Sequence, residues 1–312
     1  MGKFSLLRDA EAAAIRAAIA WLDKDPVNRL LKLIQLLQSA DSNGTLKKQL
    51  DDMKLELEKQ EGVVYELITG IFAEVDASVR TRLIENFLLN AIHVGSSKQD
   101  EVMARFQKKI PWLLYSDPYK PEQELLSNAE VQAATTAGKN AGIGLFVFPD
   151  MRWGERLTDI FRIAETNTDL LFAVCVKPEV VSDQVIDQVM KVKNMVLILQ
   201  GEEGETYDRA VSLLQTRKAP FGTAVISSAV EELERIMAEK VRQKIRQVVF
   251  LSEEPLNGEA LQKLDTWANA YRETHPVMTV GLWKKEDGSL YLPLGVGAHP
   301  EVCLAVLPED LN

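Results

Sequence analysis

From residue 110 to residue 271, short apolar runs alternate with amphipathic stretches, and this alternation leaves few architectures open to the chain. The apolar runs occupy residues 111–115, 143–148, 170–174, 195–199, 221–226 and 247–251. The stretches with helical spacing occupy residues 128–140, 154–164, 182–191, 205–216, 229–243 and 258–271. Strands that alternate with helices in this way predict a parallel sheet covered by helices.

The number of strand–helix units selects the form of that sheet. Six units recur, with a spacing that suits right-handed βαβ crossovers. A closed (β/α)8 barrel takes about 250 residues, whereas only about 200 follow the helical part of this chain. We therefore predict an α/β fold with an open or partial (β/α)6 barrel, and a doubly wound sheet is the alternative. Further apolar runs at 278–283, 290–294 and 302–306 predict a final strand and a hairpin.

The chain before this alternation has helical spacing only. A turn signal at residues 41–44 ends an early helix, later helices are predicted over 63–72 and 79–92, and another is predicted from residue 97. We therefore predict two domains. Residues 1–108 form an all-helical N-terminal domain, and residues 109–312 form the partial β/α barrel with its C-terminal strands.

Composition excludes several classes of function. The net charge of −10 argues against binding to nucleic acid or to an anionic membrane surface, since both need a basic face. No apolar run approaches the roughly 20 residues that span a bilayer, and the N-terminus lacks the pattern of a signal peptide. Cys175 and Cys303 give no disulfide framework. A cytoplasmic location is the expectation.

Two segments resemble one group of bacterial radical S-adenosylmethionine (radical SAM) proteins. Residues 85–95, in a helix rich in Asn and Phe, are followed by Ile-Pro-Trp at 110–112 and Asp-Pro at 117–118. The similarity continues over residues 126–143 and includes Ala-Pro-Phe-Gly at 219–222. In that group, the Asp-Pro step leads into a Cys-x3-Cys-x2-Cys loop that holds a [4Fe–4S] cluster, and a Gly-Gly-Glu-Pro turn after the second strand holds the methionine moiety.

This chain departs from the group at both places. Residues 119–126 read Tyr-Lys-Pro-Glu-Gln-Glu-Leu-Leu and contain no cysteine, whereas the cluster needs three thiolates. The second predicted strand ends in Phe-Pro-Asp-Met-Arg at 148–152 in place of the glycine-rich turn. The departures predict that neither a [4Fe–4S] cluster nor S-adenosylmethionine is bound and that no radical chemistry occurs. The chain is then expected to be a pseudoenzyme that acts as a binding, regulatory or partner subunit.

The candidate site lies in the loops that follow the predicted strands, where such folds place their functional residues. Acidic groups outnumber basic ones there, which favours an amine or cation as ligand, or a carboxylate pair in acid–base work. A solvated rim of polar loops is the alternative interpretation. The candidate ligand-binding residues at this barrel mouth are Asp117, Asp150, Arg152, Lys177, Glu202, Glu253 and Glu254.

Other chemistry is not indicated by the sequence. His299 and Cys303 have metal-ligand spacing, but the surrounding glycines and proline argue against a helix, so no metal site is predicted. No phosphate-binding glycine motif follows a strand, and no catalytic residue is assigned. The alternative function is a small-molecule-binding protein, or a repurposed enzyme without cofactor at the acidic mouth. The partner is expected to be a small molecule, a protein or a second copy of the chain.

Overall fold

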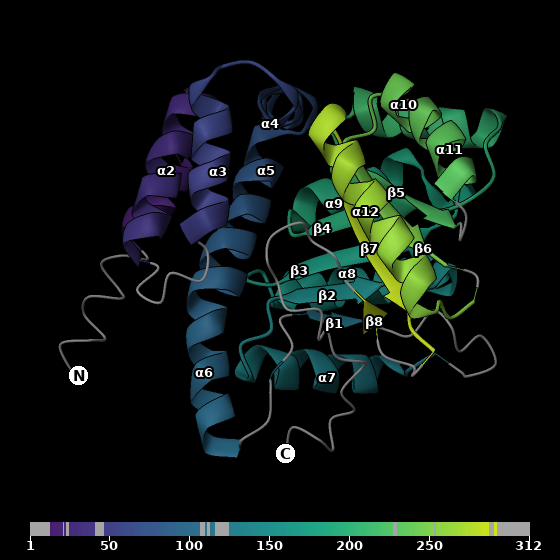
Figure 1. Ribbon diagram of the computed structural model, residues 1–312. Coiled ribbons are helices and arrows are strands. Elements are labelled where there is room, and N and C mark those ends of the chain that lie inside the picture. The colour runs from purple at the N-terminus through teal and green to yellow at the C-terminus, as the bar shows by residue number, and fades with distance from the viewer. Residues whose placement is uncertain are drawn as a thin grey trace.

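The computed structural model describes residues 13–20, 22, 25–40, 47–106, 110, 113–115, 125–226, 230–252, 254–286 and 290–291. A single eight-stranded sheet has its strands in chain order (Figure 1). The strands are β1 (Leu113–Tyr115), β2 (Leu145–Phe148), β3 (Leu171–Val176), β4 (Met195–Leu199), β5 (Phe221–Ile226), β6 (Gln247–Leu251), β7 (Met278–Lys284) and β8 (Leu290–Tyr291).

Neighbouring strands from β1 to β7 are parallel, and β8 is antiparallel to β7. The connecting helices are α7 (Asn128–Asn140), α8 (Leu157–Thr166), α9 (Asp183–Val192), α10 (Glu205–Thr216), α11 (Val230–Arg242) and α12 (Gly258–Thr274). Short 3-10 helices, η3 (Met151–Arg156) and η4 (Pro178–Val180), follow β2 and β3. The predicted partial (β/α)6 barrel with a final strand and a hairpin is confirmed, except that the apolar run at 302–306 lies outside the described residues.

The two faces of the sheet differ, and this difference excludes the doubly wound alternative. One core cluster joins the strands to all six connecting helices, with members such as Phe172, Leu197 and Phe250. The other face has its own apolar cluster, made of strand residues only. Its buried members are Leu113, Tyr115, Cys175, Ile198, Ala224, Val249, Leu251 and Leu282. Helices therefore cover the outer face of the curled sheet, whereas a doubly wound sheet has helices on both faces.

The N-terminal region forms a helical layer beside the sheet (Figure 1). It contains α2 (Pro26–Ala40), α3 (Lys47–Glu58), α4 (Val63–Glu74), α5 (Ala77–Ile84), the π-helix η2 (Glu85–Val94) and α6 (Gly95–Phe106). The first helices share an apolar core that includes Leu33, Ile34 and Leu57. An independent N-terminal domain stays a prediction, because α4, the start of α5, η2 and α6 all contact the barrel.

The break predicted between residues 92 and 97 is absent, and helical turns run from Ala77 to Phe106. Gly95 lies where the break was expected, and it packs against the backbone at Gly142. A Cβ atom at Gly95 would lie 2.6 Å from the carbonyl oxygen of Gly142. The glycine therefore allows a helix to approach the sheet closely instead of ending the helix.

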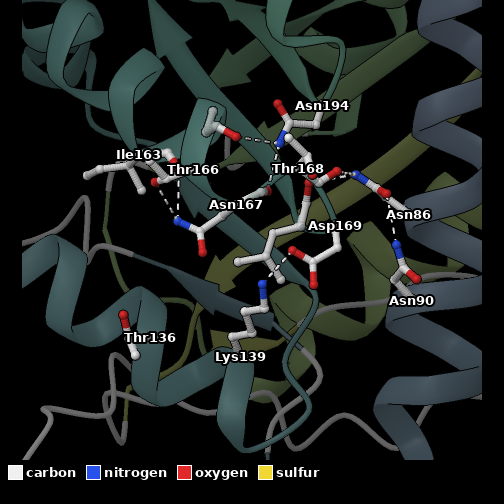
Figure 2. A network of polar contacts seen from close by, with 12 residues as sticks. Asn86, Asn90, Thr136, Lys139, Ile163, Thr166, Asn167, Thr168, Asp169 and Asn194 are labelled. Atoms are coloured by element: carbon white, nitrogen blue, oxygen red, sulfur yellow. Dashed lines mark hydrogen bonds and ion pairs between the residues drawn. The ribbon is translucent and has the colours of Figure 1, made fainter.

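The helical layer covers the amino ends of the strands. The Asn86 side chain donates to the carbonyl oxygens of Thr168 and Leu170, just before β3, and Figure 2 shows this network. The Gln99 side chain donates to the carbonyl oxygen of Gly142, before β2, at 3.1 Å. Two further contacts reach the segments before β5 and β6. Before β5, the carbonyl oxygen of Lys218 accepts from the backbone N–H of Asp76. Before β6, Arg246 forms an ion pair with Glu74.

Candidate functional site

The opposite edge of the sheet, where the strands end, carries the residues that the sequence predicted as a site. We call this edge the mouth, and it comprises the described residues that directly follow β2, β3, β4 and β6. Of the predicted residues, Asp117 and Glu253 lie outside the described part of the chain. The others follow the ends of these strands as expected: Asp150, Arg152, Lys177, Glu202 and Glu254.

Asp150 and Arg152 neutralise each other. The Asp150 carboxylate caps η3 by accepting from the backbone N–H of Arg152 at 2.9 Å, and it accepts from Nε of the same side chain at 2.8 Å. The hydrogen bond to Asp150 raises the pKa of Arg152. A local pair of this kind fixes the turn after β2. The pair leaves little net charge for a ligand to recognise, and the contacts described for these two residues stabilise the turn.

Lys177 is also paired, although weakly. Its ammonium lies 4.0 Å from the Glu155 carboxylate, and both side chains are at least half exposed. A pair of this kind at the surface contributes little to stability, because water and salt screen it. Glu202 and Glu254 are exposed, and neither has an ion pair among the described residues.

Gln200 is the residue of the mouth that the sequence did not single out. It follows β4, whose residues Val196 and Ile198 belong to the inner apolar cluster, so alternation along the strand places Gln200 on the inner face. Its side chain is only 8% exposed. Its Oε1 atom is buried and accepts no hydrogen bond within the described part of the protein. No sequence signal distinguishes such a glutamine from a solvated one.

Cys175 lies on the inner face at the end of β3. Burial and, to a smaller extent, the nearby Asp150 charge raise the pKa of its thiol to about 12. The group is therefore a thiol at neutral pH, and a thiol is a poor metal ligand. The described residues contain no group of three or more His, Cys, Asp or Glu side chains placed to hold a metal ion.

Comparisons with known proteins show no family for this chain. Neither a protein-family profile nor a curated protein matches the sequence. Crystal structures of SuiB from Streptococcus suis are similar to this chain. One SuiB structure shares 10% identity and a TM-score of 0.46 over 73% of this chain and 64% of SuiB.

Two further SuiB structures contain ligands. SuiB bound to S-adenosylmethionine shares 9% identity and a TM-score of 0.43, over 57% of this chain and 52% of SuiB. SuiB bound to its precursor peptide SuiA shares 7% identity and a TM-score of 0.43, over 60% of this chain and 53% of SuiB. This chain thus matches between half and two thirds of SuiB, and its fold assignment rests on its own strand pairing.

One prediction from the sequence is corrected by this comparison. We expected neither S-adenosylmethionine nor a [4Fe–4S] cluster, but a protein with a similar arrangement of elements binds S-adenosylmethionine. The prediction took the missing cysteine loop and the missing glycine-rich turn as evidence that the whole cofactor is absent, and the comparison contradicts it. Cysteines hold the cluster, whereas a nucleoside and an amino acid moiety are bound by other groups at a barrel mouth.

No described helix is long and apolar enough to cross a membrane.

Proposed function

We propose that this chain is a binding protein whose ligand enters the partial barrel at the mouth. The helical layer covers the amino ends of the strands. A ligand would therefore reach the inner face of the sheet from the carboxyl ends of the strands. The inner face is apolar and suits the body of an organic ligand. The polar loops around it suit the recognition of a head group.

The observation that carries the proposal is the unpartnered Oε1 atom of Gln200. Buried polar atoms are nearly always hydrogen-bonded, and an exception calls for an explanation such as an absent ligand. A ligand that donates a hydrogen bond to this oxygen would satisfy it. The expected role as a partner or regulatory subunit is one form of this proposal, in which the ligand is a segment of another protein.

The similarity to SuiB decides which compounds enter a binding screen. SuiB has been crystallised with S-adenosylmethionine and with the precursor peptide SuiA. Both S-adenosylmethionine and blocked peptides should therefore be screened with the full chain by thermal shift, together with amines and nucleosides. A ligand that binds only the folded state at a hundred times its Kd stabilises by about 2.7 kcal/mol.

The variant Gln200→Leu tests the proposal without a known ligand. Removing an unsatisfied buried oxygen should leave the free energy of unfolding unchanged or raise it by roughly 1 kcal/mol. A matched control is Asn194→Leu, because the Oδ1 atom of Asn194 is also buried without a hydrogen-bond partner among the described residues, whereas its amide nitrogen donates to the carbonyl oxygens of Ala164 and Asn167. That control should lose about 2 kcal/mol or more. Destabilisation of Gln200→Leu by a similar amount would contradict the proposal, as would an unchanged response of this variant to a ligand that stabilises the wild type.

A further inference from the structure

We propose that the ligand carries a primary ammonium group, which donates to Oε1 of Gln200 and lies in the field of the carboxylates around the mouth. This inference depends on the proposed function and adds the chemical class of the ligand. The oxygen of Gln200 can only accept a hydrogen bond, so its partner must be a donor. An ammonium group has three N–H donors and is the donor that a negative surrounding favours.

The mouth has unpaired negative charge near Gln200. Glu202 lies two residues beyond Gln200 in the same loop, and it is exposed. The exposed carboxylates of the mouth that form no ion pair in the described part of the chain are Glu179, Glu202, Glu205 and Glu254. Glu179 follows β3, the neighbour of β4, Glu202 and Glu205 follow β4 itself, and Glu254 follows β6, two strands away from β4.

The positive groups of the same region are already paired. Arg152 is held by Asp150, and Lys177 lies near Glu155. The buried ammonium of Lys240 lies 3.0 Å from Glu203, so that carboxylate is excluded from the unpaired set. The charge that remains for a ligand around β3 and β4 is therefore negative.

Lysines at the end of β7 lie beside the segment that carries Glu254. Lys284 ends β7, and its carbonyl oxygen accepts from the backbone N–H of Leu256 at 2.7 Å, two residues beyond Glu254. Lys285 follows Lys284 and pairs with Leu256 in a β-bridge. These lysines therefore offset the charge of Glu254, and the carboxylates after β3 and β4 are the ones on which the inference depends.

The helix ends at the mouth do not favour an anionic ligand either. Helices that follow parallel strands begin at the carboxyl edge, and their positive amino ends attract anions. Several of these helices carry their own carboxylate in the first turn: Asp159 in α8, Asp183 in α9, Glu205 and Asp208 in α10, and Glu259 in α12. These side chains offset the positive helix ends.

Calorimetric titration of the full chain with spermidine tests the inference. The expected result is binding that weakens with added salt and that weakens by about tenfold or more in Gln200→Leu, since a hydrogen bond to a charged group is lost. The triple variant Glu202→Gln, Glu205→Gln, Glu254→Gln should weaken binding by about tenfold at low salt. A matched triple variant in the helical layer, Glu61→Gln, Asp100→Asn, Glu101→Gln, changes the net charge equally and should stay within about twofold.

Two blocked peptides, trilysine and triglycine, show where the ammonium group comes from and which of the two proposals fails. If trilysine binds and spermidine does not, the ammonium group belongs to a protein partner. If spermidine binds and trilysine does not, it belongs to a free amine. If a blocked triglycine peptide binds as tightly as trilysine and loses affinity in Gln200→Leu, the mouth binds neutral donors and the ammonium inference is overturned, while the proposed function stands. If neither spermidine nor trilysine binds, the ammonium inference is also overturned. The proposed function is then tested separately by the free energy of unfolding of Gln200→Leu.

Discussion

The side-chain amide of Asn86 donates a hydrogen bond of 2.8 Å to the carbonyl oxygen of Leu170, 84 residues further along the chain. The same nitrogen donates to the carbonyl oxygen of Thr168 at 2.9 Å, and the Asn86 oxygen accepts from Asn90. Asn86 is fully buried, and Leu170 directly precedes β3. One asparagine thus joins the π-helix of the helical layer to the amino end of a central strand.

Replacement of Asn86 by Ala should lower the free energy of unfolding by about 2–3 kcal/mol, because two carbonyl oxygens lose their donor in a buried place. Asn90→Ala is the matched control. It removes one hydrogen bond to a side chain and should lower the same free energy by about 1 kcal/mol. Urea unfolding measures both. Equal effects of the two substitutions would show that Asn86 does not hold the layer on the barrel.

The pair of Arg246 and Glu74 should couple the helical layer to β6. The Arg246 Nη2 atom lies 2.8 Å from one carboxylate oxygen of Glu74, and Nε lies 3.0 Å from the other. This hydrogen-bonded carboxylate raises the pKa of Arg246. A double-mutant cycle with Arg246→Met and Glu74→Gln should give a coupling energy of about 1 kcal/mol, because the pair is partly exposed. A coupling near zero at low salt would contradict this expectation.

Lys240 and Tyr207 should respond unequally to substitution. The buried Lys240 ammonium donates to the Tyr207 hydroxyl at 2.9 Å, and that hydroxyl also pairs with Thr223 at 2.7 Å. Lys240→Met removes a buried charge whose other partner, Glu203, is exposed, so stability should change by less than about 1 kcal/mol. Tyr207→Phe leaves the charge buried with one partner fewer and should lower stability by about 2 kcal/mol. Thermal unfolding of both variants measures the difference, and the reverse order would contradict it.

Cys175 should be almost inert in the folded protein. A pKa raised from 9.0 to about 12 lowers the thiolate fraction at pH 8 by about a thousandfold. In a Cys303→Ser background, Ellman's reagent should therefore label Cys175 at least that much more slowly in the folded protein than in urea. Rapid labelling of the folded state would show that the thiol is accessible.

The same shift predicts how stability depends on pH. The folded pKa lies above the unfolded pKa, so the contribution of Cys175 is fully present below pH 9.0. It falls as the pH rises from 9.0 towards 12, where the unfolded thiol ionises and the folded thiol does not. Cys175→Ala should reduce the alkaline loss of stability, which urea titrations at pH 8 and pH 10 would measure.

The residue pattern alone determined where the strands and helices of the barrel lie. The predicted limits of α7, α10, β4, β5 and β6 are those of the structure. These limits depend on neighbours in the chain. For α7, Ser127 accepts from the backbone N–H of Glu130, and the Glu130 carboxylate accepts from the backbone N–H of Ser127. Alternation of apolar residues and helix capping act over a few residues, so both can be recognised in the sequence.

Only the tertiary structure decided which ends of the strands are covered and which mouth residues are neutralised. Asn86 meets its partners 82 and 84 residues away, and no local pattern encodes such a meeting. The charged residues that the sequence predicted as a site are not equally available to a ligand, because Asp150 and Arg152 pair with each other. Gln200 became the informative residue because its side-chain oxygen has no hydrogen-bond partner among the described residues. Whether a buried polar atom is satisfied depends on every element packed around it, and only the folded chain brings those elements together.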